Sequence, residues 1–223
     1  MGAIGNHGRT GAKEAVCRSH LRQWASVFDS AMLDNDGYFP SRSVADGAWW
    51  IEALWAYHQD EGLLVCPAAT KASSDVLPTH RAWRAAKRVG SYGVNGSVGR
   101  LKEDTYRMAL GRWQTPRVWD AEKIPLFGDM CWTNAWPNPS DFPPFSEQSI
   151  YELSGGEMRL VCVNRHDGSI NLLFMDGSVR KVGLKELWTL KWSMSYNTEG
   201  PWTIVGGVPP TAWPEWMRQF KDF

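Results

Sequence analysis

An apolar stripe along the first part of the chain most constrains how it can fold. Apolar side chains recur every three or four residues between positions 12 and 35, and polar residues lie between them. The stripe consists of Cys17, Leu21, Trp24, Phe28 and Met32. This spacing predicts one long amphipathic helix over residues 12–35, with Gly37 suited to a left-handed cap and Pro40 close behind. Such a helix must bury its stripe against another layer of structure.

Three short strands are predicted in the second half of the chain. Residues 158–164, 169–175 and 178–182 are rich in apolar side chains, and the pairs Asp167-Gly168 and Asp176-Gly177 separate them. Aspartate and glycine tolerate a positive φ, so these pairs indicate hairpin turns. The sequence therefore predicts an antiparallel β-meander over residues 158–182. A long N-terminal helix packed on such a small antiparallel sheet is an α+β domain.

The remaining segments carry weaker signals. Residues 46–60 are typical of a short helix, residues 63–67 of a strand or extended edge, and residues 90–99 of a glycine-rich strand and turn. The spacing of these glycines is not that of a dinucleotide-binding loop. Residues 113–150 hold six prolines and no periodicity, which predicts a long loop insertion over the surface. Residues 183–188 and 213–220 are expected to form short helical turns.

Composition limits the class of protein. The 24 basic and 24 acidic residues balance, so net charge points to neither nucleic acid nor an anionic membrane surface. No apolar run approaches the roughly 18 residues that a membrane-spanning helix needs. The N-terminus also lacks the apolar region of a signal peptide. We expect residues 1–11 to be disordered or cloning-derived, and residues 12–223 to form a single globular domain.

No catalytic motif of a hydrolase, zinc protease, dithiol oxidoreductase or kinase is present, so we expect no enzyme activity. His166 is the best acid–base candidate, but a histidine beside a turn more often has a structural role. Asp176 is explained by turn geometry. Asp34 and Asp36 resemble the start of a calcium loop, but Val44 and Ala45 follow where further ligands should lie. A helix cap is the favoured interpretation there. Calcium bound by these two aspartates is the alternative, and no other cofactor is expected.

Cysteines and tryptophans leave several interpretations open. Cys17, Cys66, Cys131 and Cys162 are widely spaced and form no CxxC pair, which disfavours a four-cysteine metal site. They could form two disulfides or remain buried thiols, depending on the compartment. Five of the fourteen tryptophans lie in proline-rich loops and are too many to be buried together. These are Trp119, Trp132, Trp136, Trp202 and Trp213. Exposed tryptophan marks contacts with protein, sugar or membrane interfaces.

Two stretches resemble one bacterial family. KEAVCRSHLRQWASVFDSAMLDNDGYFPSR, residues 13–42, resembles the part of a type IV pilin-like or type II secretion pseudopilin helix that follows the membrane segment. It ends in the family's N-D-G-x-x-P element at Asn35, Asp36 and Gly37. His166 and Asp176-Gly177 are separated by nine residues, which matches the His-(nine residues)-Asp-Gly motif of the prepilin-type processing-associated domain. Residues 64–67 and 91–96 resemble the cysteine-proline and S-Y-G-x-N elements between them.

The resemblance implies a pilin-like fold and a structural subunit of a filament or pseudopilus, without an active site. Its partners would be copies of itself, other pilin-like subunits and the secretion or pilus machinery. It would lie outside the cytoplasm, at the periplasmic face of the inner membrane or in a surface filament. It would meet the membrane only through an apolar N-terminal helix that this chain lacks. A secreted or surface module that binds carbohydrate or peptide through its loop tryptophans is the alternative.

Two finer expectations accompany this resemblance. In an extracytoplasmic domain, Cys17 and Cys66 are plausible disulfide partners that would tie the helix to the body, and Cys131 and Cys162 would then pair. Four cysteines allow three pairings, and the sequence alone does not choose among them. His166 and Asp176 are expected to face one region near the sheet edge and to hold the meander through hydrogen bonds rather than to perform chemistry.

Overall fold

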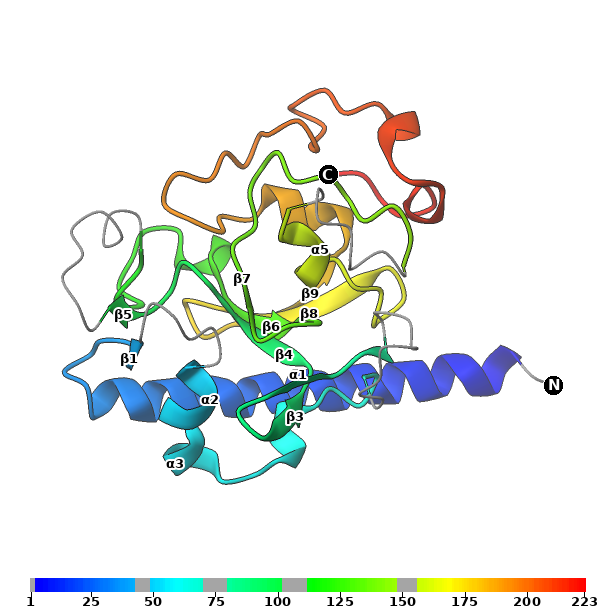
Figure 1. The fold of residues 1–223 in the computed structure, drawn as a ribbon. Coiled ribbons are helices and arrows are strands. Elements are labelled where there is room, and N and C mark those ends of the chain that lie inside the picture. Colours follow the sequence, from blue (N-terminus) through cyan, green and yellow to red (C-terminus); the bar gives the residue numbers. More distant parts are fainter. Residues whose placement is uncertain (1–2, 43–48, 70–79, 102–111, 148–155) are drawn as a thin grey trace.

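A computed structural model of the chain describes residues 3–42, 49–69, 80–101, 112–147 and 156–223. A long N-terminal helix lies along a five-stranded sheet, and short helical turns and loops cover the other side (Figure 1). The predicted α+β class is therefore confirmed. The first three residues of the expected helix 46–60 and the last three of the expected loop 113–150 lie outside the described residues.

Helix α1 (Ala3–Leu33) begins earlier than the stripe predicts. Residues 3–11, expected to be disordered or cloning-derived, are helical. All five side chains of the predicted stripe are buried. The helix ends at the predicted place, since Gly37 has φ +83° and its N–H donates to the Met32 carbonyl at 2.8 Å. A left-handed glycine just beyond the last turn satisfies a carbonyl that would otherwise lack a partner.

The sheet has the strand order β7-β4-β6-β8-β9. Its strands are β4 (Tyr92–Asn95), β6 (Pro125–Asp129), β7 (Asn134–Ala135), β8 (Ser169–Phe174) and β9 (Val179–Gly183). Only β4 and β7 pair in parallel, and the other neighbours are antiparallel. The prediction that residues 113–150 form a loop insertion is wrong in its middle, because the central strand β6 and the edge strand β7 lie there.

The predicted meander is correct only in its second half. Asp176-Gly177 connects β8 to β9 as a hairpin, with Gly177 at φ +81°. Residues 158–164 form no strand. Helix α5 (Met158–Val161) lies there instead, because β6 pairs with the edge of β8 that a first meander strand would have used. Asp167-Gly168 has positive φ at both residues but leads from the segment after α5 into β8, so it is not a hairpin turn.

One hydrophobic core packs on each face of the sheet. Leu173 of β8 belongs to the core that includes α1 and α2 (Trp49–Ala53), whereas Leu172 and Phe174 belong to the core beneath α5 and the C-terminal segment. Alternate residues of a strand point to opposite faces, so β8 is buried at all six positions. The sheet is thus the middle of three layers (Figure 1).

Smaller elements surround these layers. They are α3 (Trp55–His58), the parallel pair β1 (Ser41–Arg42) and β5 (Arg100–Leu101), the hairpin β2 (Trp83–Ala85) and β3 (Arg88–Gly90), and the 3-10 turns η1 (Gly62–Leu64), η3 (Ala121–Lys123), η4 (Lys185–Thr189), η5 (Pro210–Ala212) and η6 (Glu215–Met217). The strand or extended edge expected over residues 63–67 is wrong at its start, since Leu63 and Leu64 belong to η1, whereas Val65 after it has an extended backbone. Within the described ranges, no helix combines the length and the apolar character needed to cross a bilayer.

Candidate functional site

Four side chains from distant parts of the chain meet in the interior. They are Cys17 from α1, Cys66 from the segment after η1, Asp129 from the end of β6 and His166 from the loop before β8, and they are called the buried cluster below. Every one has zero relative exposure. One donor atom from each residue lies within 4.8 Å of the donor atoms of the other three. The fold therefore concentrates two sulfurs, a carboxylate and an imidazole in one closed space.

Asp129 is at the centre of this arrangement. Its Oδ2 lies 3.1 Å from Nε2 of His166 and 3.5 Å from Sγ of Cys17, and it accepts the backbone N–H of Asn171 at 2.9 Å. Its Oδ1 accepts a hydrogen bond from the Arg165 guanidinium at 3.0 Å. A buried carboxylate needs this degree of hydrogen bonding and charge pairing to remain ionised.

Arg165 supplies the buried positive charge. Besides Asp129, its guanidinium donates to the carbonyl oxygens of Met130 at 2.7 Å, Arg81 at 3.0 Å, and Ser91. These carbonyls come from separate segments, so the planar guanidinium is fixed in one orientation against Oδ1. Oδ2 is left facing the cysteines and the histidine.

The electrostatic field of these groups shifts their acidities. Burial alone would lower the pKa of His166, but the charge of Asp129 and the hydrogen bond to it raise the pKa to about 9. Burial would raise the pKa of Asp129, but His166 and Arg165 hold it well below its usual value. For Cys66, burial is outweighed by hydrogen bonds with Cys17 and His166, and the thiol pKa falls from 9.0 to about 7. Burial raises that of Cys17 well above 9.0.

Cys66 and His166 complete the contacts within the cluster. The Cys66 sulfur lies 3.5 Å from Nε2 of His166, and the Tyr92 hydroxyl donates to the Cys17 sulfur at 3.4 Å. The second ring nitrogen of His166 is buried and has no hydrogen-bond partner among the described residues. Nε2 is thus the ring atom that connects His166 to polar groups. Thiolate, imidazole and carboxylate are together the donor types of zinc and related metals.

The other residues predicted as sites lie elsewhere. Asp176 is exposed in the β8–β9 turn and accepts hydrogen bonds from Ser178 N–H at 2.9 Å and Oγ at 2.6 Å. His166 precedes β8 and Asp176 follows it, so the expectation that they face one region is wrong. They lie at opposite ends of a strand of six residues.

The predicted calcium ligands belong to the end of α1. Asp34 accepts a hydrogen bond from the Tyr57 hydroxyl at 3.1 Å, and Asp36, with φ 56°, belongs to the turn formed by Asn35, Asp36 and Gly37. Among the described residues, the buried cluster is the one group of three or more potential metal ligands, and it includes neither aspartate.

The cysteines share a core in the expected pairs but are not bonded. All four are free and buried, so neither expected disulfide is formed. Cys17 and Cys66 lie in the core beneath α1, and Cys131 and Cys162 lie in the core on the opposite face of the sheet. The fold therefore separates one pair, which faces Asp129 and His166, from another pair on the opposite face of the sheet.

Sequence reasoning missed Asp129 and Arg165. Asp129 directly follows the apolar run Pro125–Gly128. This run lies within residues 113–150, where the many prolines led us to predict a surface loop. A carboxylate at the end of a buried strand signals a partner charge, and Arg165 beside His166 was available for that role. The two residues are 36 positions apart, so no short sequence motif contains both of them.

A separate surface groove of about 900 Å³ carries several aromatic side chains. Its lining includes Phe142, Phe145, Trp202, Trp213 and Trp216, together with Arg159 and Arg218. Phe142 and Phe145 are 63% and 75% exposed. Of the loop tryptophans, Trp119 is 94% exposed, whereas Trp213 is buried. The loops therefore both complete a core and present aromatic surface.

Comparisons with protein-family models, with curated proteins and with solved structures find no match.

Proposed function

We propose that this chain is a structural subunit of a pilin-like filament or type II secretion pseudopilus. The observation that carries the proposal is the position of α1. At about 1.5 Å per residue, its 31 residues span roughly 46 Å, whereas the six-residue β8 spans roughly 20 Å. The helix is too long for the sheet to cover, and its amino end extends past the body (Figure 1).

The two halves of α1 have different surroundings. Its buried stripe begins at Cys17, and residues 11–13, 15 and 16 are exposed. At the boundary, Glu14 pairs with Lys181 of β9 at 3.0 Å and with Arg18 at 3.7 Å. The helix is thus attached to the sheet from about its fourth turn onward. A segment preceding it would continue along the helix axis, away from the body, as a filament core of pilin-like helices requires.

The closed interior supports a structural rather than a catalytic role. The titratable groups with the strongest mutual interactions, those of the buried cluster, have zero exposure, and none of them lines the aromatic groove described above. The proposal includes an extracytoplasmic location and assembly with copies of the chain or other pilin-like subunits. The motifs around Asn35–Gly37, His166 and Asp176 support this family, and in the structure they form a helix end, a buried hydrogen-bonded side chain and a hairpin turn.

Disulfide cross-linking in cells tests the helix-centred assembly. Ser19 lies on the exposed side of α1, and Ser195 is an exposed serine far along the chain. Ser19→Cys and Ser195→Cys, each in a chain with an apolar helix of about 20 residues fused before Ala3, therefore form a matched pair. The four native cysteines are buried and should not form disulfides between subunits. We expect oxidation to link Ser19→Cys subunits into dimers and to leave Ser195→Cys monomeric. Cross-links through Ser195→Cys alone, or through neither position, would contradict assembly along α1.

The aromatic groove favours a second candidate, a surface module that binds carbohydrate or peptide. Exposed Phe142 and Phe145 offer stacking faces, and the positively charged Arg159 and Arg218 line the same groove. Glycan-array and peptide-array binding by the wild-type chain tests this function. Binding that is lost in Phe145→Ala and kept in Trp119→Ala, an exposed aromatic outside the groove, would support it.

A further inference from the structure

We propose that the buried cluster binds one zinc ion in a closed, four-ligand structural site. Its four donors are a thiolate from α1, a thiolate from the segment after η1, Oδ2 of Asp129 and Nε2 of His166. Structural zinc sites are almost always tetrahedral, with all four ligands from the protein, and they are built from these donor types. The inference is independent of filament assembly, since it concerns only the interior.

Three of the six distances between the donors match the edges of a zinc tetrahedron, and all six are within 4.8 Å. Zinc lies about 2.3 Å from sulfur and about 2.0–2.1 Å from nitrogen or oxygen. At the tetrahedral angle, a sulfur is then about 3.5 Å from a nitrogen or oxygen ligand, and nitrogen and oxygen are about 3.3 Å apart. The sulfur of Cys17 is 3.5 Å from Oδ2 of Asp129, and this Oδ2 is 3.1 Å from Nε2 of His166. The second sulfur, that of Cys66, lies 3.5 Å from the histidine nitrogen.

The charges also fit a divalent ion. Two thiolates and one carboxylate around Zn²⁺ leave a single negative charge, and the Arg165 guanidinium at 3.0 Å from Asp129 Oδ1 neutralises it. A buried site with no net charge avoids the large cost of an unpaired charge in the interior. Arg165 binds the oxygen that faces away from the cysteines, so it and a metal at Oδ2 do not compete for the same lone pairs.

Outer hydrogen bonds would orient the ligands. The Tyr92 hydroxyl donates to the Cys17 sulfur at 3.4 Å, and the Asn171 N–H donates to Oδ2 of Asp129 at 2.9 Å. Partners of this kind fix the positions of metal ligands and tune the site. They come from β4 and β8, so the central strands of the sheet form the wall of the site.

Other occupants account for fewer of the observations. Calcium prefers six to eight oxygen ligands, and two of the four donors here are sulfur. A disulfide between Cys17 and Cys66 would explain why two sulfurs meet, but it would not explain why a carboxylate and an imidazole face them. Zinc uses all four groups. It would join α1, the segment after η1, β6 and the loop before β8, whose ligands are separated by up to 149 positions, and so stabilise the folded state.

Metal analysis of the full chain tests the site. The wild-type protein, expressed with added zinc and purified under reducing conditions, should hold about one zinc per chain. Replacing zinc with Co²⁺ should give the intense visible bands of a tetrahedral site and a thiolate-to-cobalt charge-transfer band. Removal of zinc by a chelator should lower the melting temperature, and added zinc should restore it.

Two cysteine variants locate the metal. Cys66→Ala removes one ligand, whereas Cys162→Ala removes a buried thiol from the opposite core. We expect zinc content to fall at least about tenfold in the first and to stay at the wild-type level in the second. Equal zinc content in both variants would overturn the assignment.

Metal uptake by the wild-type chain tests the zinc site even if a cysteine variant fails to fold. A folded chain that takes up neither zinc nor cobalt would overturn the proposal. So would a non-reduced mass lower by two hydrogen atoms with a peptide map that joins Cys17 to Cys66, because the ligands would then be consumed as a disulfide.

Discussion

At the scale of single residues, Asp129 has the largest consequences for the interior. Its two oxygens contact a guanidinium, an imidazole, a thiol and a backbone N–H, all of them buried. A neighbouring charge that loses its partner in such a place has no water to replace it. The stability of the domain should therefore depend on this carboxylate far more than on any exposed one.

We predict that Asp129→Asn lowers the free energy of unfolding by about 3–5 kcal/mol, because it leaves Arg165 buried without its counter-charge. Asp176→Asn is the matched control. That side chain is exposed, and an asparagine oxygen can accept the same two hydrogen bonds from Ser178, so the expected change is within about 0.5 kcal/mol. Urea unfolding of both variants measures the difference, and equal losses would show that the buried pair contributes nothing specific.

At the scale of elements, α1 could be predicted from the sequence because it is buried on one side only. The central strands of the sheet are buried on both faces and were harder to recognise. A helix with one covered face shows a stripe, and Trp24 and Phe28 mark it clearly. β6 and β8 are buried at every position, so neither shows the alternation of a half-exposed strand. Pro125 and Gly128 in β6 then favoured a loop. The sequence could indicate β8 only through its flanking turn and its apolar residues.

The buried cluster escaped sequence analysis for a related reason. Close ligand pairs such as CxxC reveal a metal site because local geometry brings them together. Here each donor comes from a different element, and only the packing of α1 on the sheet brings Cys17 to Asp129. His166 and the two cysteines could be singled out by residue type and by resemblance. That these side chains lie together could not be predicted, because it depends on contacts between distant parts of the chain.

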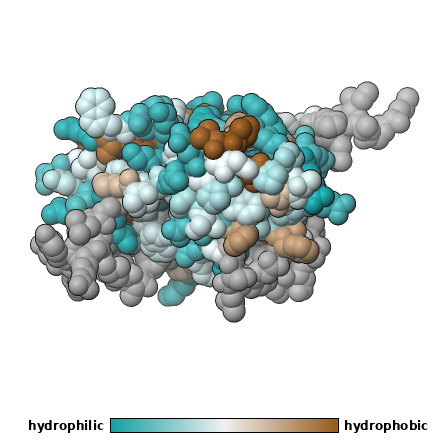
Figure 2. All heavy atoms as spheres, turned by 90° about the horizontal axis from the view of Figure 1, so that it is seen from above, coloured by the Kyte–Doolittle hydropathy of each residue, from teal (hydrophilic) through white to brown (hydrophobic). Residues whose placement is uncertain are grey.

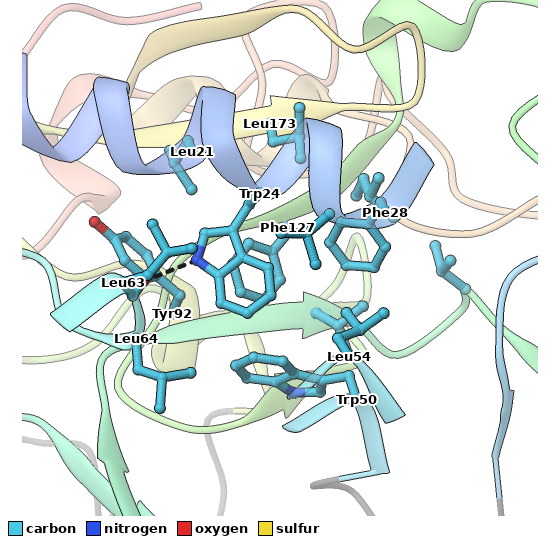
Figure 3. Close-up of a cluster of buried hydrophobic side chains, with 14 of the residues drawn as sticks. Leu21, Trp24, Phe28, Trp50, Leu54, Leu63, Leu64, Tyr92, Phe127 and Leu173 are labelled. Carbon is cyan, nitrogen blue, oxygen red and sulfur yellow. Dashed lines mark hydrogen bonds between the residues drawn. The ribbon is translucent and has the colours of Figure 1, made fainter. Parts of the chain in front are cut away.

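The contact of α1 with the sheet is centred on Trp24. Its ring packs against Phe127 at 4.8 Å and Trp50 at 5.4 Å between ring centroids, and its Nε1 donates to the Leu63 carbonyl at 2.9 Å (Figure 3). We predict that Trp24→Ala costs about 3–5 kcal/mol of stability through the cavity it leaves. Trp119→Ala removes the same ring from a site that is 94% exposed and should change stability by less than about 0.5 kcal/mol. Thermal and urea unfolding compare the two, and a small loss at Trp24 would contradict the packing described.

The spacing of β6 and β8 gives a second prediction at this scale. A Cβ added at Gly128 would lie 2.5 Å from the Asn171 carbonyl oxygen, so the backbone of one strand must shift. We predict that Gly128→Ala destabilises the fold by about 1–3 kcal/mol. In Gly11→Ala, the new methyl meets nothing within 4 Å, and alanine favours the helix by up to about 1 kcal/mol. Urea unfolding followed by circular dichroism should therefore show a lower free energy of unfolding for Gly128→Ala and a higher one for Gly11→Ala. A stabilised Gly128→Ala would refute the close strand contact.

At the scale of the whole molecule, the exposed large apolar side chains of the described residues are spread over several segments of the chain. On the face seen in Figure 2, hydrophobic patches are small and lie among hydrophilic or neutral side chains. The exposed large apolar residues include Leu33, Trp119, Phe145 and Val205, which lie in separate segments of the chain. Scattered exposed apolar side chains are normal for monomeric proteins. Assembly would thus depend on α1 and on what precedes it.

We predict that residues 1–223 are a monomer of about 25.2 kDa by light scattering, and that fusion of an apolar helix of about 20 residues before Ala3 makes the chain associate. The residues of α1 that precede the buried stripe explain this expectation. Residues 8, 9 and 11–13 are glycine, alanine, arginine or lysine, which provide no continuous apolar face for a second helix. The fused segment would supply that face along the axis of α1. Filaments formed by residues 1–223 alone would show that loop surfaces drive assembly. In that case Phe145→Ser should weaken them, whereas Arg9→Ala on the helix should not.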